Sequence, residues 1–114
     1  MNIEKFEDIL AWQKAGQLSV LIYRTLQDSR DYDFRSQIQR AAVSVMNNIA
    51  EGFERRSNKD FKNFLFIAKG SCAEVRSMAY LGCRLEYFDE KCFKDIYNLS
   101  TEISKMISGL IKTL

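Results

Sequence analysis

The chain has 114 residues, no histidine, no proline and a formal net charge of +2. This length supports a single domain, residues 1–114, with a real hydrophobic core. The lack of histidine excludes Ser-His-Asp and Cys-His catalytic arrangements as well as histidine metal sites. The lack of proline favours long uninterrupted helices, and so small a net charge does not by itself indicate a nucleic-acid partner.

Four segments show the hydrophobic period of three to four residues that is typical of amphipathic helices. The first runs from about residue 8 to residue 28, where a polar stretch at 29–33 breaks the pattern, and the second from about 34 to 54. Ser57 opens the third helix, with Asp60 three positions later as in many helix N-termini, and this helix extends to about residue 86. Asp89 is a suitable N-cap for the fourth helix, which runs to the end of the chain. The short connections predict an antiparallel, up-down-up-down four-helix bundle of the all-α class.

Each predicted helix contributes one apolar stripe to the expected core. The first two stripes are Ile9, Trp12, Ala15, Leu18, Ile22 and Leu26, then Ile38, Ala42, Val45, Ile49 and Phe53. The other two are Phe61, Phe64, Leu65, Ala68, Cys72, Val75, Ala79 and Leu85, then Phe93, Ile96, Leu99, Ile103, Met106, Leu110 and Leu114.

The three cysteines, Cys72, Cys83 and Cys92, form no CxxC pair and match no zinc spacing. An odd number of cysteines, together with an acidic N-terminus that lacks the apolar region of a signal peptide, indicates reduced thiols and a cytoplasmic protein. No stretch approaches the ~20 apolar residues of a membrane span. We therefore expect no membrane association.

The sequence offers no set of residues for catalysis. No glycine-rich phosphate loop is present, and the carboxylate pairs Glu7/Asp8 and Asp89/Glu90 lie at predicted helix starts, where they favour the helix dipole. We predict a non-enzymatic protein with no catalytic residues, no cofactor, no metal ion and no small-molecule substrate.

The second predicted helix carries a polar arc beside its apolar stripe. Successive helical residues are about 100° apart, which places Gln37, Arg40, Ser44, Asn48 and Glu51 on one side. Arg40 and Glu51 are three turns apart, so they cannot pair with each other and need partners on another helix, another subunit or a ligand. The arc is either ordinary solvated surface or a polar interface, such as the lining of an oligomer channel.

The turn after this helix is basic. Residues 35–76 carry eight basic and four acidic side chains, a net charge of +4, whereas the rest of the chain carries −2. A basic cluster at a helix N-terminus suits phosphate, because the backbone N–H groups and the dipole favour anions there, although most such clusters are solvated surface. The candidate nucleic-acid contacts are Arg40, Arg55, Arg56, Lys59 and Lys62.

The third helix contains small residues at 68–73 with Gly70 in its interior. An interior glycine costs a helix about 1 kcal/mol relative to alanine, so we expect another helix to approach closely there, within the subunit or between subunits. Phe61, Phe64 and Phe66 cover more than one side of this helix. One of them either contacts another subunit or is simply exposed.

Several motifs together resemble the bacterial four-helix bundle proteins that are often encoded within intervening sequences of large-subunit ribosomal RNA genes. They are FED at 6–8, WQKA at 12–15, QIQRAAVSV at 37–45 and NIAEG at 48–52. The resemblance implies an up-down-up-down bundle and a homo-oligomer, a ring of five subunits, without known catalysis. A related branch resembles the accessory variability determinants of diversity-generating retroelements, basic pentamers that bind a reverse transcriptase and nucleic acid.

Two hypotheses for the function remain open. The first is an oligomeric binding subunit that contacts RNA, DNA or a nucleic-acid enzyme through the candidate cations, with affinity that weakens as salt is added. The second is a protein-interaction scaffold with no nucleic-acid role, in which the polar arc makes salt bridges between subunits or to a partner.

Overall fold

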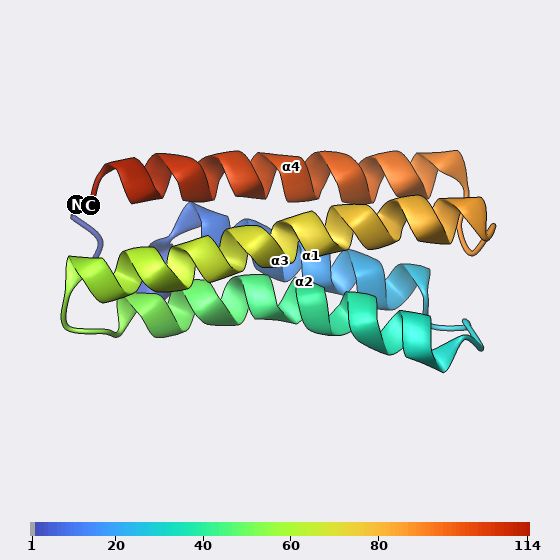
Figure 1. Cartoon of the computed structure of the whole chain (residues 1–114), viewed down its shortest axis with the longest axis horizontal. Helices are drawn as coiled ribbons and strands as arrows, with labels where there is room; N and C mark the ends of the chain where they lie inside the picture. The colour runs from blue at the N-terminus through green and yellow to red at the C-terminus, as the bar shows by residue number, and fades with distance from the viewer. Residues whose placement is uncertain (1) are drawn as a thin grey trace.

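The computed structural model describes residues 2–114, which form four long α-helices and one short 3-10 helix and contain no strand. The helices lie side by side in a body that measures 43 × 21 × 19 Å (Figure 1). The prediction of an all-helical fold with four helices is confirmed. The bounds are Phe6–Asp8 for η1, Leu10–Thr25 for α1, Tyr32–Phe53 for α2, Asn58–Arg84 for α3 and Glu90–Lys112 for α4.

The four helices stand at the corners of a square. Helix α2 packs against α1 and α3, and α4 packs against the same two helices, whereas α1 and α3 do not pack against each other within the described chain. Figure 1 shows α1 behind α3, with α4 above and α2 below. Each helix therefore has an inner face, two seams with its neighbours and one outward face, and the outward faces of α1 and α3 point in opposite directions.

The core consists of the inner stripes of the four helices. Most of the predicted stripe positions are fully buried, among them Leu18, Ile38 and Leu65. Some are only half-buried: Trp12, Phe53, Phe64 and, in the fourth stripe, Phe93, Leu99, Met106, Leu110 and Leu114. The prediction that Leu85 lies in the core is wrong: this residue is 47% exposed because α3 ends at Arg84 and the chain turns away there.

Three helices begin with a side-chain cap. The side chain of Ser57 accepts the backbone N–H of Asp60 at 3.1 Å, and Asp89 accepts that of Cys92 at 2.8 Å, so both predicted caps are confirmed. Asp31 caps α2 by accepting the N–H of Phe34 at 3.1 Å. These bonds satisfy backbone donors that a helix N-terminus otherwise leaves free.

The connections at one end of the bundle are joined by a side-chain bond. After α3 the chain turns through Glu86, which has a φ of 60°, and the hydroxyl of Tyr87 donates to the carboxylate of Asp31 in the α1–α2 connection. The Tyr87 ring packs edge-on against Phe34, with 5.1 Å between ring centroids. This hydrogen bond lowers the pKa of Asp31, and the Phe34 backbone N–H lowers it further.

None of the helices in residues 2–114 combines the length and the apolar character that crossing a membrane requires. Within the same residues, no group of three or more Cys, Asp or Glu side chains is placed to hold a metal ion.

Candidate nucleic-acid and subunit interfaces

Part of the predicted polar arc lies in the seam between α2 and α3. The hydroxyls of Ser44 and Ser71 hydrogen-bond to each other at 2.9 Å. The Asn48 side-chain N–H₂ group donates to the carbonyl oxygen of Ser44 at 2.8 Å and to its hydroxyl at 2.9 Å. The bond between Ser44 and Ser71 therefore joins α2 to α3, and Asn48 supports Ser44 from within α2.

Glu51 has a partner just beyond the end of its own helix. One of its carboxylate oxygens lies 2.9 Å from a guanidinium nitrogen of Arg55, four residues later in the connection between α2 and α3. The expectation that Glu51 needs a partner on another helix, another subunit or a ligand is therefore wrong. Both side chains are about half exposed, so the pair contributes little stability. The Arg55 guanidinium also lies over the ring of Phe64, 4.7 Å from its centroid.

Arg40 and Gln37 are exposed on α2, away from the basic turn. Arg40 borders a shallow hollow with Tyr23 and Asn47, and among residues 2–114 no carboxylate lies within ion-pair distance of it. Arg40 precedes Arg55 by fifteen residues, which is about 22 Å along a helix. The five candidate nucleic-acid residues thus do not form one patch.

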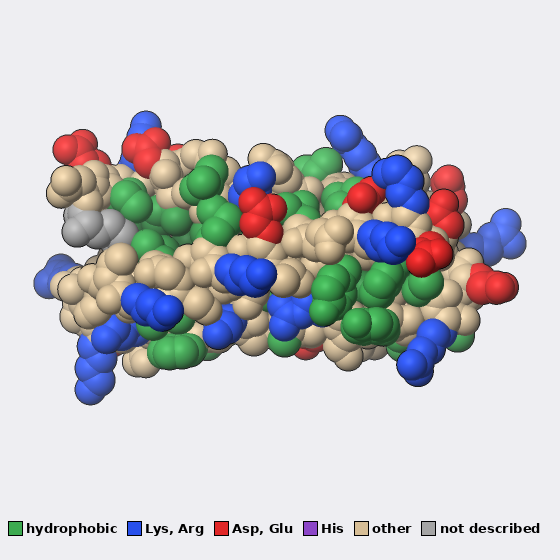
Figure 2. Space-filling model, turned by 90° about the horizontal axis from the view of Figure 1, so that it is seen from above, with side chains coloured by type: hydrophobic (Ala, Val, Ile, Leu, Met, Phe, Trp, Pro, Cys, Tyr) green, Lys and Arg blue, Asp and Glu red, His purple; other side chains and the backbone are tan. Residues whose placement is uncertain are grey.

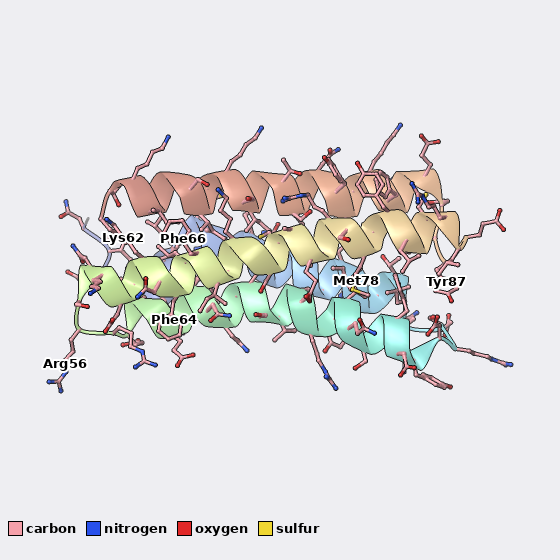
Figure 3. The ribbon with its side chains drawn as sticks, viewed as in Figure 1. Arg56, Lys62, Phe64, Phe66, Met78 and Tyr87 are labelled. Atoms are coloured by element: carbon pink, nitrogen blue, oxygen red, sulfur yellow. The ribbon has the colours of Figure 1, made fainter. Side chains whose placement is uncertain are left out.

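The other cations gather at the end of the bundle where α2 turns into α3. Arg56 and Lys59 are exposed, and Lys62 is half-buried. Figure 3 shows Arg56 pointing away from the bundle and Lys62 on the side of α3 toward α4. No carboxylate of the described chain forms an ion pair with any of these three. We call Arg56, Lys59 and Lys62 the basic end.

Gly70 lies on the outward face of α3. A methyl group at this position would meet nothing within 4 Å, so the interpretation that another helix of the same subunit approaches closely there is wrong. Gly16 of α1 has the same open surroundings. If either glycine serves packing, the packing partner comes from outside the subunit.

The three phenylalanines at the start of α3 have different environments. Phe61 is buried, Phe64 is half-buried beneath Arg55, and Phe66 is 56% exposed. Only Phe66 therefore offers most of its ring to a partner.

Two outward faces, one on α1 and one on α3, were not predicted from the sequence. On α3, the exposed residues Ile67, Gly70 and Leu81 share one side of the helix, because their separations are close to whole turns, and Glu74 is the acidic residue among them. On α1, Gly16 and Val20 line a largely apolar hollow of about 760 Å³. The spacing of Ile67 and Leu81, two heptads apart, is the signal that could have found the α3 face.

Comparison with known proteins identifies the family. Residues 7–109 match the family described as 23S rRNA-intervening sequence protein. The chain belongs to this family. The resemblance inferred from the motifs is thereby confirmed, and the family description names no enzymatic activity.

A solved structure supports the fold of this intervening sequence protein. It is the crystal structure of a protein of unknown function from the S23 ribosomal protein family of Bacteroides thetaiotaomicron, 31% identical, with a TM-score of 0.84 over 90% of this chain and 99% of that one. No curated protein matches the chain. Neither comparison assigns a role to a residue, so the interfaces rest on the geometry above.

Proposed function

We propose that this intervening sequence protein is a non-enzymatic, homo-oligomeric subunit that binds RNA or DNA through the basic end. The observation that carries the proposal is the set of three cations at the start of α3, Arg56, Lys59 and Lys62, which form no ion pair with a carboxylate of residues 2–114. Unpaired cations beside a helix N-terminus attract phosphate, and the contacts with phosphates dominate the affinity of such complexes.

The proposed subunit is an up-down-up-down bundle that assembles into a ring. Its apolar outward faces lie on α1 and α3, the helices that do not pack against each other. A contact that joins two different faces of identical subunits is heterologous and repeats until a ring closes. The number five follows from the family resemblance, and five subunits of charge +2 carry roughly +10 together.

The composition of α1 supports this assembly. The helix occupies an outer corner of the bundle, yet its sixteen residues include only two charges, Lys14 and Arg24. Lys14 is already paired with Glu102 of α4, 3.4 Å away. A helix face that stays in water is normally rich in charged residues, so the outward face of α1 fits a covered position.

Nucleic-acid binding is tested by fluorescence anisotropy with labelled 20-nucleotide RNA and DNA at ~50 and ~200 mM salt. We expect the double variant Arg56→Glu/Lys59→Glu to bind more weakly and to lose about 1.4 from the slope of log affinity against log salt, since each phosphate contact on a single strand contributes about 0.7. The charge-matched control Arg30→Glu/Lys91→Glu alters exposed cations at the other end of the bundle. Absence of wild-type binding at ~50 mM salt would overturn the proposal.

Assembly is tested separately by light scattering coupled to gel filtration. Ile67→Glu/Leu81→Glu should convert the assembly to monomers, because it places two charges on the apolar face of α3. Tyr32→Glu is the control, as Tyr32 is 63% exposed at the start of α2, outside both faces. A wild-type protein that stays monomeric at all concentrations would contradict the ring.

A protein-interaction scaffold is the second candidate, and the two apolar faces favour it. In this case the wild type assembles but binds neither RNA nor DNA. Arg40→Ala should then weaken the assembly, because Arg40 forms no ion pair within residues 2–114, whereas Glu51→Ala removes only the exposed pair with Arg55. Assembly that survives Arg40→Ala unchanged would exclude Arg40 from the subunit contact.

A further inference from the structure

One side of α3 alternates cationic and aromatic residues. Lys62, Phe66, Lys69, Arg76 and Tyr80 follow one another at separations of four, three, seven and four residues. Residues three, four or seven apart share one side of a helix. The five side chains therefore form a single stripe along about 27 Å of α3 at 1.5 Å per residue.

This stripe borders the seam between α3 and α4. The ring of Tyr80 lies 4.9 Å from that of Phe93 and 5.7 Å from that of Tyr97, both of which belong to α4. Arg76 precedes Tyr80 by one turn. Figure 3 places Lys62 and Phe66 on the same upper side of α3, toward α4.

The stripe is open to solvent and positively charged. Phe66 and Tyr80 are 56% and 49% exposed, Lys69 is exposed as well, and Lys62 and Arg76 are half-buried. Figure 2 shows lysine and arginine side chains along the length of this view, with acidic side chains among them. No carboxylate of residues 2–114 forms an ion pair with Lys62, Lys69 or Arg76.

Packing on α4 accounts for Tyr80 alone, and ordinary solvation does not account for the rest of the pattern. A solvated helix face usually carries lysine and glutamate in pairs of opposite charge, as α4 does with Lys91 and Asp95. The stripe has cations without acids, and large aromatic rings stand between them. Proteins that bind single strands combine these two features, because cations follow the phosphates while bases stack on aromatic rings.

We propose that the α3–α4 seam is a track for single-stranded nucleic acid. Lys62, Lys69 and Arg76 contact phosphates, while Phe66 and Tyr80 stack on bases. The inference rests on the proposed nucleic-acid function and extends the site from the basic end along α3, with Lys62 common to both. Single strands fit and duplexes do not, since bases in a duplex are stacked on each other and do not offer their faces to a protein ring.

The test compares three labelled probes of equal length: 20-nucleotide oligouridine, 20-nucleotide oligodeoxyuridine and a 20-base-pair RNA duplex. We expect both single strands to bind at least about 10-fold more tightly than the duplex, and the ratio between them shows whether the 2′-hydroxyl contributes. Phe66→Ala/Tyr80→Ala should weaken single-strand binding about 10-fold or more with an unchanged salt slope. Lys69→Gln/Arg76→Gln should reduce that slope by about 1.4.

Matched controls separate binding from folding. Tyr23→Ala/Tyr32→Ala removes two tyrosines that are 49% and 63% exposed on α1 and α2, and it should leave binding unchanged. Because Tyr80 packs on α4, Phe66→Leu/Tyr80→Leu keeps apolar contact but cannot stack like a ring, and it should bind as weakly as the alanine variant. Circular dichroism and solution mass verify that each variant folds and assembles like the wild type.

The outcomes distinguish the two proposals. A wild type that binds no nucleic acid overturns the proposed function and the track together. If the wild type binds and the basic-end variant Arg56→Glu/Lys59→Glu weakens it, but the aromatic variants bind like the wild type, the track alone is overturned. Duplex binding as tight as single-strand binding also overturns the track.

Discussion

Two pairs of glycines differ in where they lie on their helices: Gly52 and Gly82 face the inside of the bundle, whereas Gly16 and Gly70 face outward. The inner pair is crowded: a methyl group on Gly82 would lie 2.6 Å from the ring of Phe88, and one on Gly52 would lie 2.6 Å from the Cβ atom of Phe64. The outer pair, Gly16 and Gly70, would place a methyl group in open space. Each glycine weakens its helix by about 1 kcal/mol, but packing within the subunit explains only the inner pair. The outer glycines lie on surfaces where another molecule can approach the helix backbone closely.

The largest expected effect concerns the inner pair. Gly82→Ala should destabilise the subunit by about 2 kcal/mol, because an added methyl group in a packed core forces neighbouring side chains to shift. Gly52→Ala should act in the same direction, since the Cβ atom of Phe64 cannot rotate away. Urea unfolding followed by circular dichroism measures both changes. Stability equal to that of the wild type would show that the inner glycines are not needed for packing.

Alanine at an outer glycine should raise the free energy of unfolding rather than lower it. Gly70→Ala should stabilise the isolated subunit by about 1 kcal/mol through helix propensity alone. In the proposed ring the same variant should weaken the contact between subunits, which sedimentation at decreasing concentration measures. Gly109→Ala is the control, because Gly109 is equally open but lies on α4. Equal assembly of both variants would remove Gly70 from the subunit contact.

The pH dependence of stability tests the hydrogen bond between Tyr87 and Asp31, which lies near the inner glycine Gly82. In the folded protein the Tyr87 hydrogen bond lowers the pKa of Asp31, and the same bond raises the pKa of Tyr87. The contribution from Asp31 is therefore present above its ordinary pKa near 3.8 and is lost as pH falls. That from Tyr87 is present below pH 10.0 and is lost as pH rises.

Tyr87→Phe removes this bond but keeps the ring that packs on Phe34. We expect a lower midpoint of thermal unfolding at pH 7, and a smaller difference from the wild type below pH 4 and above pH 10. A difference that stays constant across the pH range would indicate that the bond does not contribute to stability.

The smallest effect should come from the basic end. Arg56→Ala should change the free energy of unfolding by less than about 0.5 kcal/mol, because its side chain is exposed and makes no ion pair within the described chain. The urea unfolding used for the glycine variants measures this too. A loss of 1 kcal/mol or more would mean that Arg56 serves the fold rather than a ligand.

Much of the local structure followed from the sequence, and most errors concern contacts between elements. The caps Ser57 and Asp89 were predictable because capping depends on residues three positions apart. Leu85 fits the apolar period of α3 but is exposed, because periodicity does not show at which residue a helix ends and stops packing against the adjacent helices. The sequence did not single out Arg55 as the partner of Glu51, although it lies only four residues away, because helical spacing allows such a pair without requiring it.

For the candidate nucleic-acid site, the sequence predicted which residues are charged but not which of them lie together. The sequence identified the basic turn but grouped Arg40 with it, although half the length of the bundle separates them. It also treated Phe66 and the later cations of α3 separately. Their shared stripe became evident only once the contacts of Tyr80 with Phe93 and Tyr97 placed that side of α3 next to α4.

By itself the sequence determined the four helices, most residues in the inner stripes of α1, α2 and α3, and the family, since helical periodicity and spaced motifs are local properties of the chain. The tertiary structure alone decided which side of each helix meets a neighbour. That choice places Gly82 in the core and Gly70 at the surface. It likewise places Ser71 in the contact with α2 and leaves the stripe on another side of α3 exposed. The physical reason is that periodicity specifies which residues share a side of a helix, whereas the packing of several helices specifies what that side touches.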